Sequence, residues 1–260
     1  MTLQVEDLSI GFGDRTVVDG VSFEVADGQR VGIIGESGSG KSLTALAVLG
    51  LLPEDARLSG SIRFNDRELI GLADWRMANV RGRQIGIVFQ EPRTALNPIR
   101  TIGRQLVEPL LIHRLIERRQ AKATAIELAA AVRLPDPERI VRLYPHQVSG
   151  GQRQRVGIAI ALACGPGLLI ADEPTTALDV TIQAEIIALF DRLIRERGSS
   201  LVFITHDLAV LSQVSSDVIV MASGRIVERG TVRGLLDAPQ HPVTAGLVQA
   251  SVATSWEGRP

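Results

Sequence analysis

The chain contains little cysteine, few aromatic residues and almost no net charge. Cys164 is the only cysteine among 260 residues, which excludes an internal disulfide framework and any cysteine-rich metal cluster. Aromatic side chains make up 3% of the chain, and 28 Lys and Arg residues nearly balance 29 Asp and Glu residues. The formal net charge of -1 gives no bulk attraction to nucleic acid or acidic lipid, so we expect no nucleic-acid partner. We interpret Cys164 as a small buried hydrophobic residue in a reducing compartment.

Long hydrophobic runs are also missing. An uncharged apolar stretch covers 156–171, but Gly165-Pro166-Gly167 interrupts it, and no segment is apolar over the length of a membrane span. The N-terminal residues, which include Glu6 and Asp7, lack the layout of a signal peptide. The chain is nonetheless 45% hydrophobic, as expected of a globular protein with a sizeable core. If it works at a membrane, we expect it to do so through partners.

The segment 35–42, GESGSGKS, matches the phosphate-binding pattern G-x-x-x-x-G-K-[ST]. An apolar strand is predicted before it, at 30–34, and a buried helix after it. Glycines let successive backbone N–H groups surround phosphates, Lys41 can reach the terminal phosphates, and the Ser42 hydroxyl can ligate Mg²⁺. The alternative, a Gly/Ser-rich turn that binds nothing, is disfavoured by the flanking strand and helix. The residues predicted to bind the nucleoside triphosphate here are Gly35, Glu36, Ser37, Gly38, Ser39, Gly40, Lys41, Ser42 and Leu43.

An aromatic residue precedes this loop. Alternating apolar residues predict half-buried strands over 3–10 and 21–25, and a turn at 11–14 that leaves Phe12 exposed. In a chain with so few aromatic rings, Phe12 is a candidate to stack on adenine, because base stacking needs only a π-face. The alternative is a hydrophobic plug at the tip of a hairpin.

Two further predicted strands end in polar residues that suit phosphate chemistry. The strand at 85–89 ends at Gln90, and the strand at 168–171 ends at Asp172 and Glu173. Ligands of open α/β sheets bind at the carboxyl ends of the strands. Asp172 suits a Mg²⁺ ligand, and Glu173 could then orient or deprotonate the attacking water. The alternative, a strand that ends in solvated acids, is disfavoured by the phosphate loop upstream.

His206 follows another buried strand, predicted at 201–204. A lone histidine is usually structural, but this one stands at the same predicted sheet edge, so we favour a sensor of the γ-phosphate. Downstream, the pattern over 217–227 predicts a closing hairpin, and 241–252 a final helix.

The sequence from 91 to about 148 predicts several helices interrupted by prolines. We predict a helical insertion over about 91–160 within an α/β domain at 1–240, followed by a short C-terminal extension at 241–260. One cationic cluster within it stands at helical spacing and could touch a partner or lipid headgroups. We favour a solvated helix face for this cluster, which consists of Arg114, Arg118, Arg119 and Lys122.

A second anion-binding helix start follows the insertion. Ser149-Gly150-Gly151-Gln152 precedes a predicted helix, and such helix N-termini bind anions. The pattern is weak alone and becomes informative because the phosphate loop is present. Asp179 follows in a turn before a clearly amphipathic helix.

Together these motifs resemble the nucleotide-binding subunit of an ABC transporter, over nearly the whole chain. The resemblance implies an α/β P-loop NTPase with a RecA-like mixed-sheet core, an antiparallel β subdomain and a helical subdomain. Val148 replaces the leucine that usually opens the signature. The matching motifs are Walker A (Lys41, Ser42), the Q-loop (Gln90), the signature (Ser149, Gly150, Gly151, Gln152), Walker B (Asp172, Glu173), the D-loop (Ala177, Leu178, Asp179) and the switch histidine (His206).

The resemblance also implies a mechanism, in which two such domains pair head-to-tail. Each ATP would then lie between one phosphate loop and the signature of the other subunit. Glu173 would polarise water, His206 would contact the γ-phosphate, and Gln90 would link the metal to the helical insertion, which grips the membrane subunit. A degenerate, non-enzymatic regulator is disfavoured because Lys41, Asp172, Glu173 and His206 are all intact.

Finer features are similar to the oligopeptide, dipeptide and nickel importer branch. The similar segments are 89–98, 144–147, 171–181 and 241–247, with Val243 where tyrosine is common. Members often carry a cysteine cluster that can bind iron–sulfur, but here Cys164 stands alone, so we expect no such cluster.

This branch implies an ATPase that drives uptake of oligopeptides or dipeptides through two separate permease subunits. We expect a second, different ATPase subunit as its pair, a substrate-binding protein outside the membrane, and a peripheral position on the cytoplasmic face of the inner or plasma membrane. The alternatives are a nickel or metal-chelate importer and a soluble ABC ATPase that acts on DNA or ribosomes. The latter usually carries coiled-coil, zinc or tandem-domain insertions, and this sequence shows none.

Overall fold

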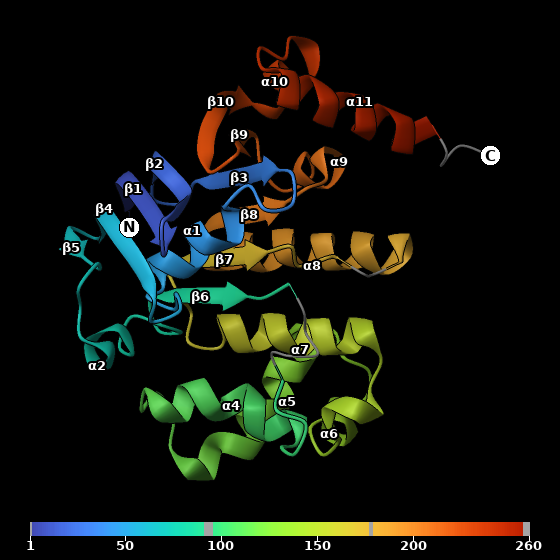
Figure 1. The fold of residues 1–260 in the computed structure, drawn as a ribbon. Helices are drawn as coiled ribbons and strands as arrows, with labels where there is room; N and C mark the ends of the chain where they lie inside the picture. Colours follow the sequence, from blue (N-terminus) through green and yellow to red (C-terminus); the bar gives the residue numbers. More distant parts are fainter. Residues whose placement is uncertain (1, 91–95, 177–178, 257–260) are drawn as a thin grey trace. The chain divides into compact units, whose positions relative to one another are not determined.

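The computed structural model describes residues 2–90, 96–176 and 179–256 (Figure 1). The chain forms two compact units, one made of 1–77 with 200–260 and the other of 78–199. Within the described residues, the first unit holds an antiparallel sheet and a set of mostly parallel strands, and the second holds a pair of parallel strands and a helical segment.

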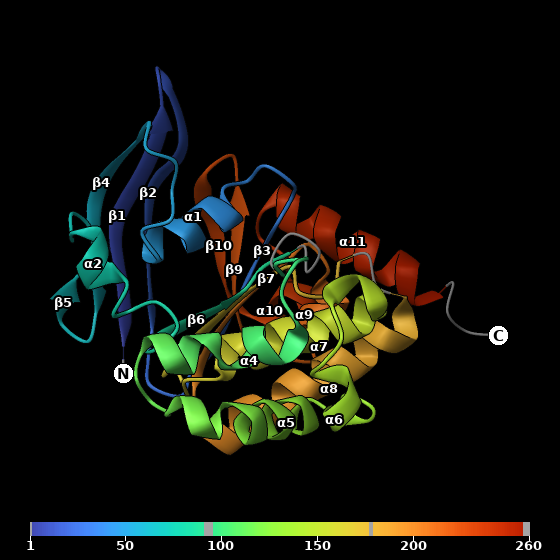
Figure 2. The same ribbon diagram turned by 90° about the horizontal axis from the view of Figure 1, so that it is seen from below.

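An antiparallel sheet forms from the N-terminal half of the first unit, with strand order β2-β1-β4-β5. Figure 2 shows β1, β2 and β4 side by side. Asp7 has a φ of 47°, in the left-handed region, and forms a bulge in β1. The bulge shifts the alternation of buried and exposed side chains, so the apolar residue after Val5 is Leu8 and not residue 7. The strands are β1 (Leu3–Phe12), β2 (Arg15–Val25), β4 (Ala56–Phe64) and β5 (Arg67–Glu68).

The other sheet strands of this unit are mostly parallel, and β3, β8 and β9 are almost fully buried, whereas β10 is not. β3 pairs in parallel with β8 on one side and with β9 on the other, and β10 closes the antiparallel hairpin with β9. Buried parallel strands are apolar on both faces, which explains the continuous runs in their sequences. Their bounds are β3 (Arg30–Gly35), β8 (Ser200–Thr205), β9 (Asp217–Ala222) and β10 (Arg225–Thr231).

Among the residues that the structure describes, five helices complete the first unit. The helix that follows β3 is the one that begins at the end of the predicted phosphate loop. They are α1 (Lys41–Val48), α2 (Asp74–Met77), α9 (Leu208–Leu211), α10 (Val232–Asp237) and α11 (Pro242–Trp256).

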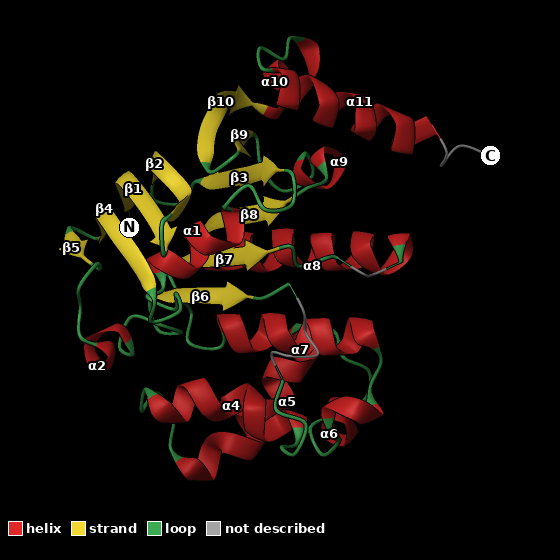
Figure 3. Cartoon of the chain, viewed as in Figure 1, coloured by secondary structure: helices red, strands yellow, loops and turns green. Residues whose placement is uncertain are grey.

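The second unit consists of two parallel strands and a helical segment, which Figure 3 shows as mostly helix between α4 and α7. β6 packs closely on α7, because a Cβ at Gly86 would lie 2.4 Å from the carbonyl oxygen of Ala161. The elements are β6 (Ile85–Val88), α4 (Ile102–Ile112), a 3-10 helix (Arg118–Gln120), α5 (Ala121–Ala131), α6 (Pro137–Ile140), a 3-10 helix (Pro145–Gln147), α7 (Gly150–Leu162), β7 (Leu168–Asp172) and α8 (Val180–Arg197).

Most predicted strands and helices are confirmed, but the spacing of the cationic cluster is not. α4 ends at Ile112, Arg114 has a positive φ of 55°, and Arg118 and Arg119 lie in a 3-10 helix. The four cations, Lys122 included, are exposed but do not share one helix face. The helical insertion predicted at about 91–160 lies inside the second unit, and its bounds, like those of the 241–260 extension, stay predictions.

Candidate functional site

The predicted phosphate loop connects β3 to α1, and its backbone requires glycine. Gly38 and Gly40 have φ values of 77° and 99°, a region that favours glycine. A Cβ at Gly35 would lie 2.1 Å from the carbonyl oxygen of Met221, and one at Gly40 would lie 2.9 Å from Cγ2 of Val18. The loop therefore has the tight curvature that lets backbone N–H groups surround a phosphate.

Lys41 is the first residue of α1 and is 4% exposed. Its ammonium donates hydrogen bonds to the carbonyl oxygens of Gly35 and Glu36, both at 2.8 Å, and contacts the Ser39 hydroxyl at 3.4 Å. The Lys41 ammonium therefore lies inside the predicted phosphate loop. Ser42, next along the helix, is half-buried.

Phe12 does not lie on a loop, as the sequence suggested. It is the last residue of β1, pairs with Arg15 and Ala56, and is half-buried, because the hairpin pairing continues up to the turn at Gly13 and Asp14. The prediction of an exposed ring is therefore wrong. Adenine stacking by the half-buried ring stays a prediction.

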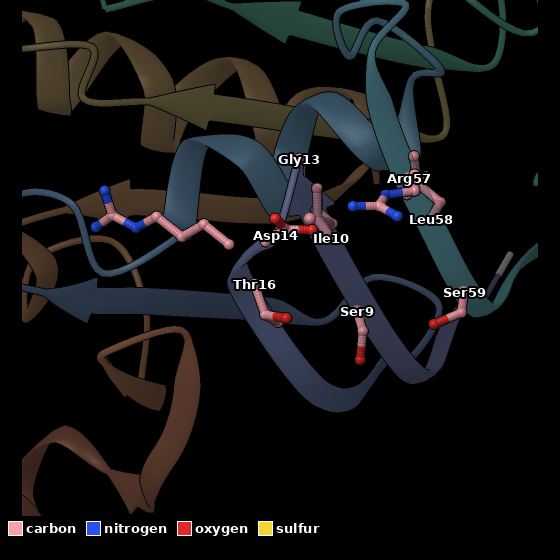
Figure 4. Close-up of a pocket in the computed structure, with 10 residues that line it drawn as sticks. Ser9, Ile10, Gly13, Asp14, Thr16, Arg57, Leu58 and Ser59 are labelled. Carbon is pink, nitrogen blue, oxygen red and sulfur yellow. The ribbon is translucent and has the colours of Figure 1, made fainter.

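A pocket of about 420 Å³ opens on the same antiparallel sheet, and Phe12 does not line it. Figure 4 shows the hydroxyls of Ser9, Thr16 and Ser59, which come from β1, β2 and β4, on one side of this sheet.

His206 follows β8 and is exposed. Ile34 of β3 pairs with Thr205 of β8, so the phosphate loop and His206 start from the same level of one sheet edge. Asp207 then caps α9 by accepting hydrogen bonds from the N–H groups of Ala209 at 2.8 Å and Val210 at 3.2 Å. His206 is thus fixed between a buried strand and a capped helix.

In the second unit, the structure brings Gln90 and Glu173 together as the sequence predicts. β6 and β7 are parallel, with Val88 opposite Ala171, so the residues beyond them leave the same edge. The side-chain amide of Gln90 donates a hydrogen bond to Oε2 of Glu173 at 3.1 Å. Asp172, the last residue of β7, is 7% exposed.

Two residues beside Glu173 were not predicted as site residues from the sequence. Oγ1 of Thr176 donates to Oε2 of Glu173 at 2.9 Å, and the amide of Gln154 donates to the carbonyl oxygen of Pro174 at 2.5 Å. Thr176 ends a Pro-Thr-Thr run, and proline and hydroxyl residues are typical of turns, so this run could have pointed to Thr176. Gln154 carries no such signal, because its partner is distant in the sequence.

The predicted signature forms the start of α7. Ser149 is the N-cap residue: its hydroxyl accepts from the N–H of Gln152 at 3.2 Å, while the Gln152 side chain accepts from the N–H of Ser149 at 3.0 Å. A Cβ at Gly151 would lie 2.9 Å from Cγ2 of Ile182, so α7 and α8 pack through this glycine. A capped helix start with two glycines leaves N–H groups open to an anion.

The D-loop and the segment after Gln90 are described only in part. Asp179 caps α8 by accepting from the N–H of Ile182 at 2.9 Å. Ala177 and Leu178 of the predicted D-loop, and 91–95 of the branch-like segment, lie outside the described residues.

Comparison with known proteins decides the family. A sequence profile of the ABC transporter family matches residues 18–176. This chain belongs to the ABC transporter family. Oligopeptide transport ATP-binding protein OppD of Escherichia coli (strain K12) is 44% identical to it, over 98% of this chain and 77% of OppD. Dipeptide transport ATP-binding protein DppD of Haemophilus influenzae is 45% identical, over 95% of this chain and 76% of DppD.

Solved structures agree with this placement. A dimeric ATP-binding cassette, MJ0796, in a post-hydrolysis state bound to ADP and Pi superposes with a TM-score of 0.78 at 28% identity, covering 89% of this chain and 99% of that one. The predicted fold class, a P-loop ABC ATPase with antiparallel β and helical parts, is confirmed, and so is the predicted ATPase activity of ABC type. The site residues themselves stay predictions.

The donor chemistry of this ABC ATPase fits Mg²⁺. The predicted ligands Ser42, Asp172 and Gln90 all offer oxygen, the element that Mg²⁺ prefers, and the Gln90 amide nitrogen already faces Glu173. Among the described residues, no group of three His, Cys, Asp or Glu side chains could hold a metal by itself.

Cys164 is half-buried, whereas the sequence predicted a buried residue. Burial raises the pKa of its thiol above the usual value, although the nearby Arg83 guanidinium opposes the shift. A raised pKa favours the neutral thiol, which is a poorer nucleophile than the thiolate. Across 2–90, 96–176 and 179–256, no helix is both long and apolar enough to cross a membrane.

Proposed function

We propose that this chain is the ATP-hydrolysing subunit of a peptide importer. It would convert ATP and water to ADP and phosphate, and so drive uptake of oligopeptides or dipeptides through two separate permease subunits. The relatives named as oligopeptide and dipeptide transport ATP-binding proteins support this substrate class, at 44–47% identity. The observation that carries the ATPase part is the contact between Gln90 and Glu173, next to Asp172 at the end of β7.

Binding of ATP is assigned to the residues of the phosphate loop, from Gly35 to Leu43. The backbone N–H groups and the Lys41 ammonium would hold the β- and γ-phosphates, exchanging the carbonyl contacts of Lys41 for phosphate oxygens of higher charge. Phe12 would support the adenine ring by stacking.

Hydrolysis needs a metal, a base and a contact to the leaving phosphate. Ser42, Asp172 and Gln90 would ligate Mg²⁺, which neutralises charge on the phosphates when bound. The Glu173 carboxylate would accept a proton from the attacking water at its side-chain oxygen, and His206 would donate a hydrogen bond to the γ-phosphate.

The signature and the D-loop would serve a second ATPase subunit. Ser149, Gly150, Gly151 and Gln152 lie at the N-terminus of a long helix, where N–H groups and the helix dipole favour an anion, and the γ-phosphate of the partner's ATP is that anion. Asp179, at the start of α8, would approach the same interface. We propose that the partner is a different ATPase subunit.

The proposed location and partners of the chain follow from its proposed role in an importer. We propose a peripheral position on the cytoplasmic face of the inner or plasma membrane, contact with the permeases through the helical segment, and an indirect link to an extracytoplasmic substrate-binding protein. No nucleic-acid partner is proposed. A nickel or metal-chelate importer is the alternative, and the peptide-transport names of the relatives favour the first reading.

The test is transport itself. The chain should be assembled with its permeases and ATPase partner in liposomes, and uptake of labelled di- and oligopeptides compared with uptake of Ni²⁺ chelates. ATP-dependent peptide uptake that disappears in Asp172→Asn supports the proposal. Uptake of the nickel chelate but of no peptide would assign the chain to the alternative.

A further inference from the structure

The carboxylate of Glu173 receives two side-chain hydrogen bonds on one oxygen. The Gln90 amide donates to Oε2 at 3.1 Å, and the Thr176 hydroxyl donates to the same atom at 2.9 Å. Gln90 follows β6, whereas Thr176 lies three residues beyond Glu173 in the same turn. The base proposed above is therefore held from two directions by groups of its own unit.

The turn that carries Glu173 has an unusual backbone. Glu173 has a φ of 45°, in the left-handed region that residues other than glycine, asparagine and aspartate rarely adopt. The N–H of Thr176 donates to the carbonyl oxygen of Glu173 at 3.2 Å and closes the turn. Such conformations persist where surrounding contacts over-determine them, often at functional sites.

A buried amide anchors this turn to α7. Gln154 is 1% exposed, and its side chain donates to the carbonyl oxygen of Pro174, the residue after Glu173. The same helix begins at Ser149. The backbone next to Glu173 is thus anchored to a long helix.

We propose that Thr176 is a positioning residue that orients the Glu173 carboxylate through its hydroxyl. The inference rests on the proposed role of Glu173 as the base. Gln90 is also a proposed ligand of Mg²⁺, so the same side chain is proposed to bind both the metal and Glu173. Thr176 has no such second role, and it lies only three residues from Glu173 in the chain. The hydroxyl donates its proton to the carboxylate only as a hydrogen bond, and the proton from water still goes to Glu173.

The test compares Thr176→Val, which keeps the shape without the hydroxyl, with Thr176→Ser, which keeps the hydroxyl. Thr101→Val is the matched control, because Thr101 lies in the same unit and its side chain makes no cap hydrogen bond. All are assayed for kcat and KM with ATP in the assembled complex. We expect kcat of Thr176→Val to fall about 10- to 100-fold with KM little changed, because misplacing a catalytic group chiefly lowers kcat. Thr176→Ser should recover most of the rate.

A double variant shows whether Thr176 acts through Glu173. In the Glu173→Gln background, adding Thr176→Val should leave the residual rate unchanged, because the group that Thr176 orients is already gone. A further fall there, wild-type kcat in Thr176→Val, or equal loss in the Ser and Val variants would overturn the inference. If Glu173→Gln alone hydrolyses ATP at the wild-type rate, the proposed base is wrong. If Glu173→Gln is inactive and Thr176→Val is fully active, only the role of Thr176 is wrong.

Discussion

The Lys41 ammonium donates a hydrogen bond across 2.8 Å to the carbonyl oxygen of Gly35, the residue that opens its own phosphate loop. The side chain of the helix start thus turns back along the loop. A buried cation needs such partners, since an unpaired charge in the interior is strongly unfavourable. Phosphate oxygens offer the same cation a partner with full negative charge.

Lys41→Met should weaken ATP binding about 10- to 100-fold, because a hydrogen bond to a charged group contributes about 1.5–3 kcal/mol. The chain should still fold, since methionine fills a similar volume without a buried charge. Arg57→Met, an exposed cation of the same unit, is the control. Nucleotide titration by fluorescence measures the effect, and equal ATP affinity in both variants would remove Lys41 from the binding site.

Gly35→Ala should destabilise the first unit by about 1–3 kcal/mol, the usual effect of overpacking. The added Cβ would meet the carbonyl oxygen of Met221 at 2.1 Å. Gly157→Ala is the control, because a Cβ there, within α7, has nothing within 4 Å and should stabilise the helix by up to about 1 kcal/mol. Urea unfolding followed by circular dichroism compares the two, and equal midpoints would contradict the close approach at Gly35.

Ser149 should show separable structural and functional roles. Ser149→Ala loses the cap of α7 and should lower stability by about 1 kcal/mol, whereas Ser149→Asp keeps a good cap and should fold normally. The new carboxylate would repel a phosphate, so Ser149→Asp should nevertheless lose ATP-dependent pairing with the partner subunit. Thr231→Asp, at the N-cap of α10, is the control. Normal pairing of Ser149→Asp, measured by size-exclusion chromatography with ATP, would exclude a phosphate at this helix start.

Glu68 should make stability fall in acid. Partial burial alone would raise the pKa of its carboxyl group, but hydrogen bonds from the Ser61 hydroxyl and from the N–H groups of Ile62, Ile70 and Leu69 outweigh it and hold the pKa below the usual 4.5. The contribution is therefore present above about pH 4.5 and lost as the pH falls through the lowered pKa.

Glu68→Gln should lower the free energy of unfolding at pH 7 by about 1 kcal/mol or less, because the Glu68 side chain is 42% exposed and water weakens its hydrogen bonds. Its stability should also vary less than that of the wild type between pH 7 and pH 3. Glu24→Gln, an exposed position on β2, is the control. Parallel urea titrations check both, and an unchanged acid dependence in Glu68→Gln would contradict the assignment.

The sequence was most informative where local chemistry decides the structure. The phosphate loop was predictable because Gly38 and Gly40 need positive φ and Lys41 must start a helix. Gln90 and Glu173 were predictable as neighbours because each follows a strand of one parallel pair.

Features set by pairing or by distant contacts were not predictable. Phe12 was placed on a loop because periodicity does not show how far a hairpin continues, and here β1 includes it. The left-handed backbone of Glu173 has no sequence signal, since glutamate rarely adopts it. Its support from Gln154 joins residues of two separate elements, and single-sequence patterns do not reveal such contacts.

The most direct test of the central claim is ATP hydrolysis by Glu173→Gln in the assembled complex, with ATP-dependent pairing of the two ATPase subunits measured alongside. The account predicts that hydrolysis falls about 10²- to 10⁴-fold, the usual contribution of a general base, while pairing with ATP becomes more stable because ATP is no longer consumed. Hydrolysis at the wild-type rate would show that Glu173 is not the base and would contradict the account.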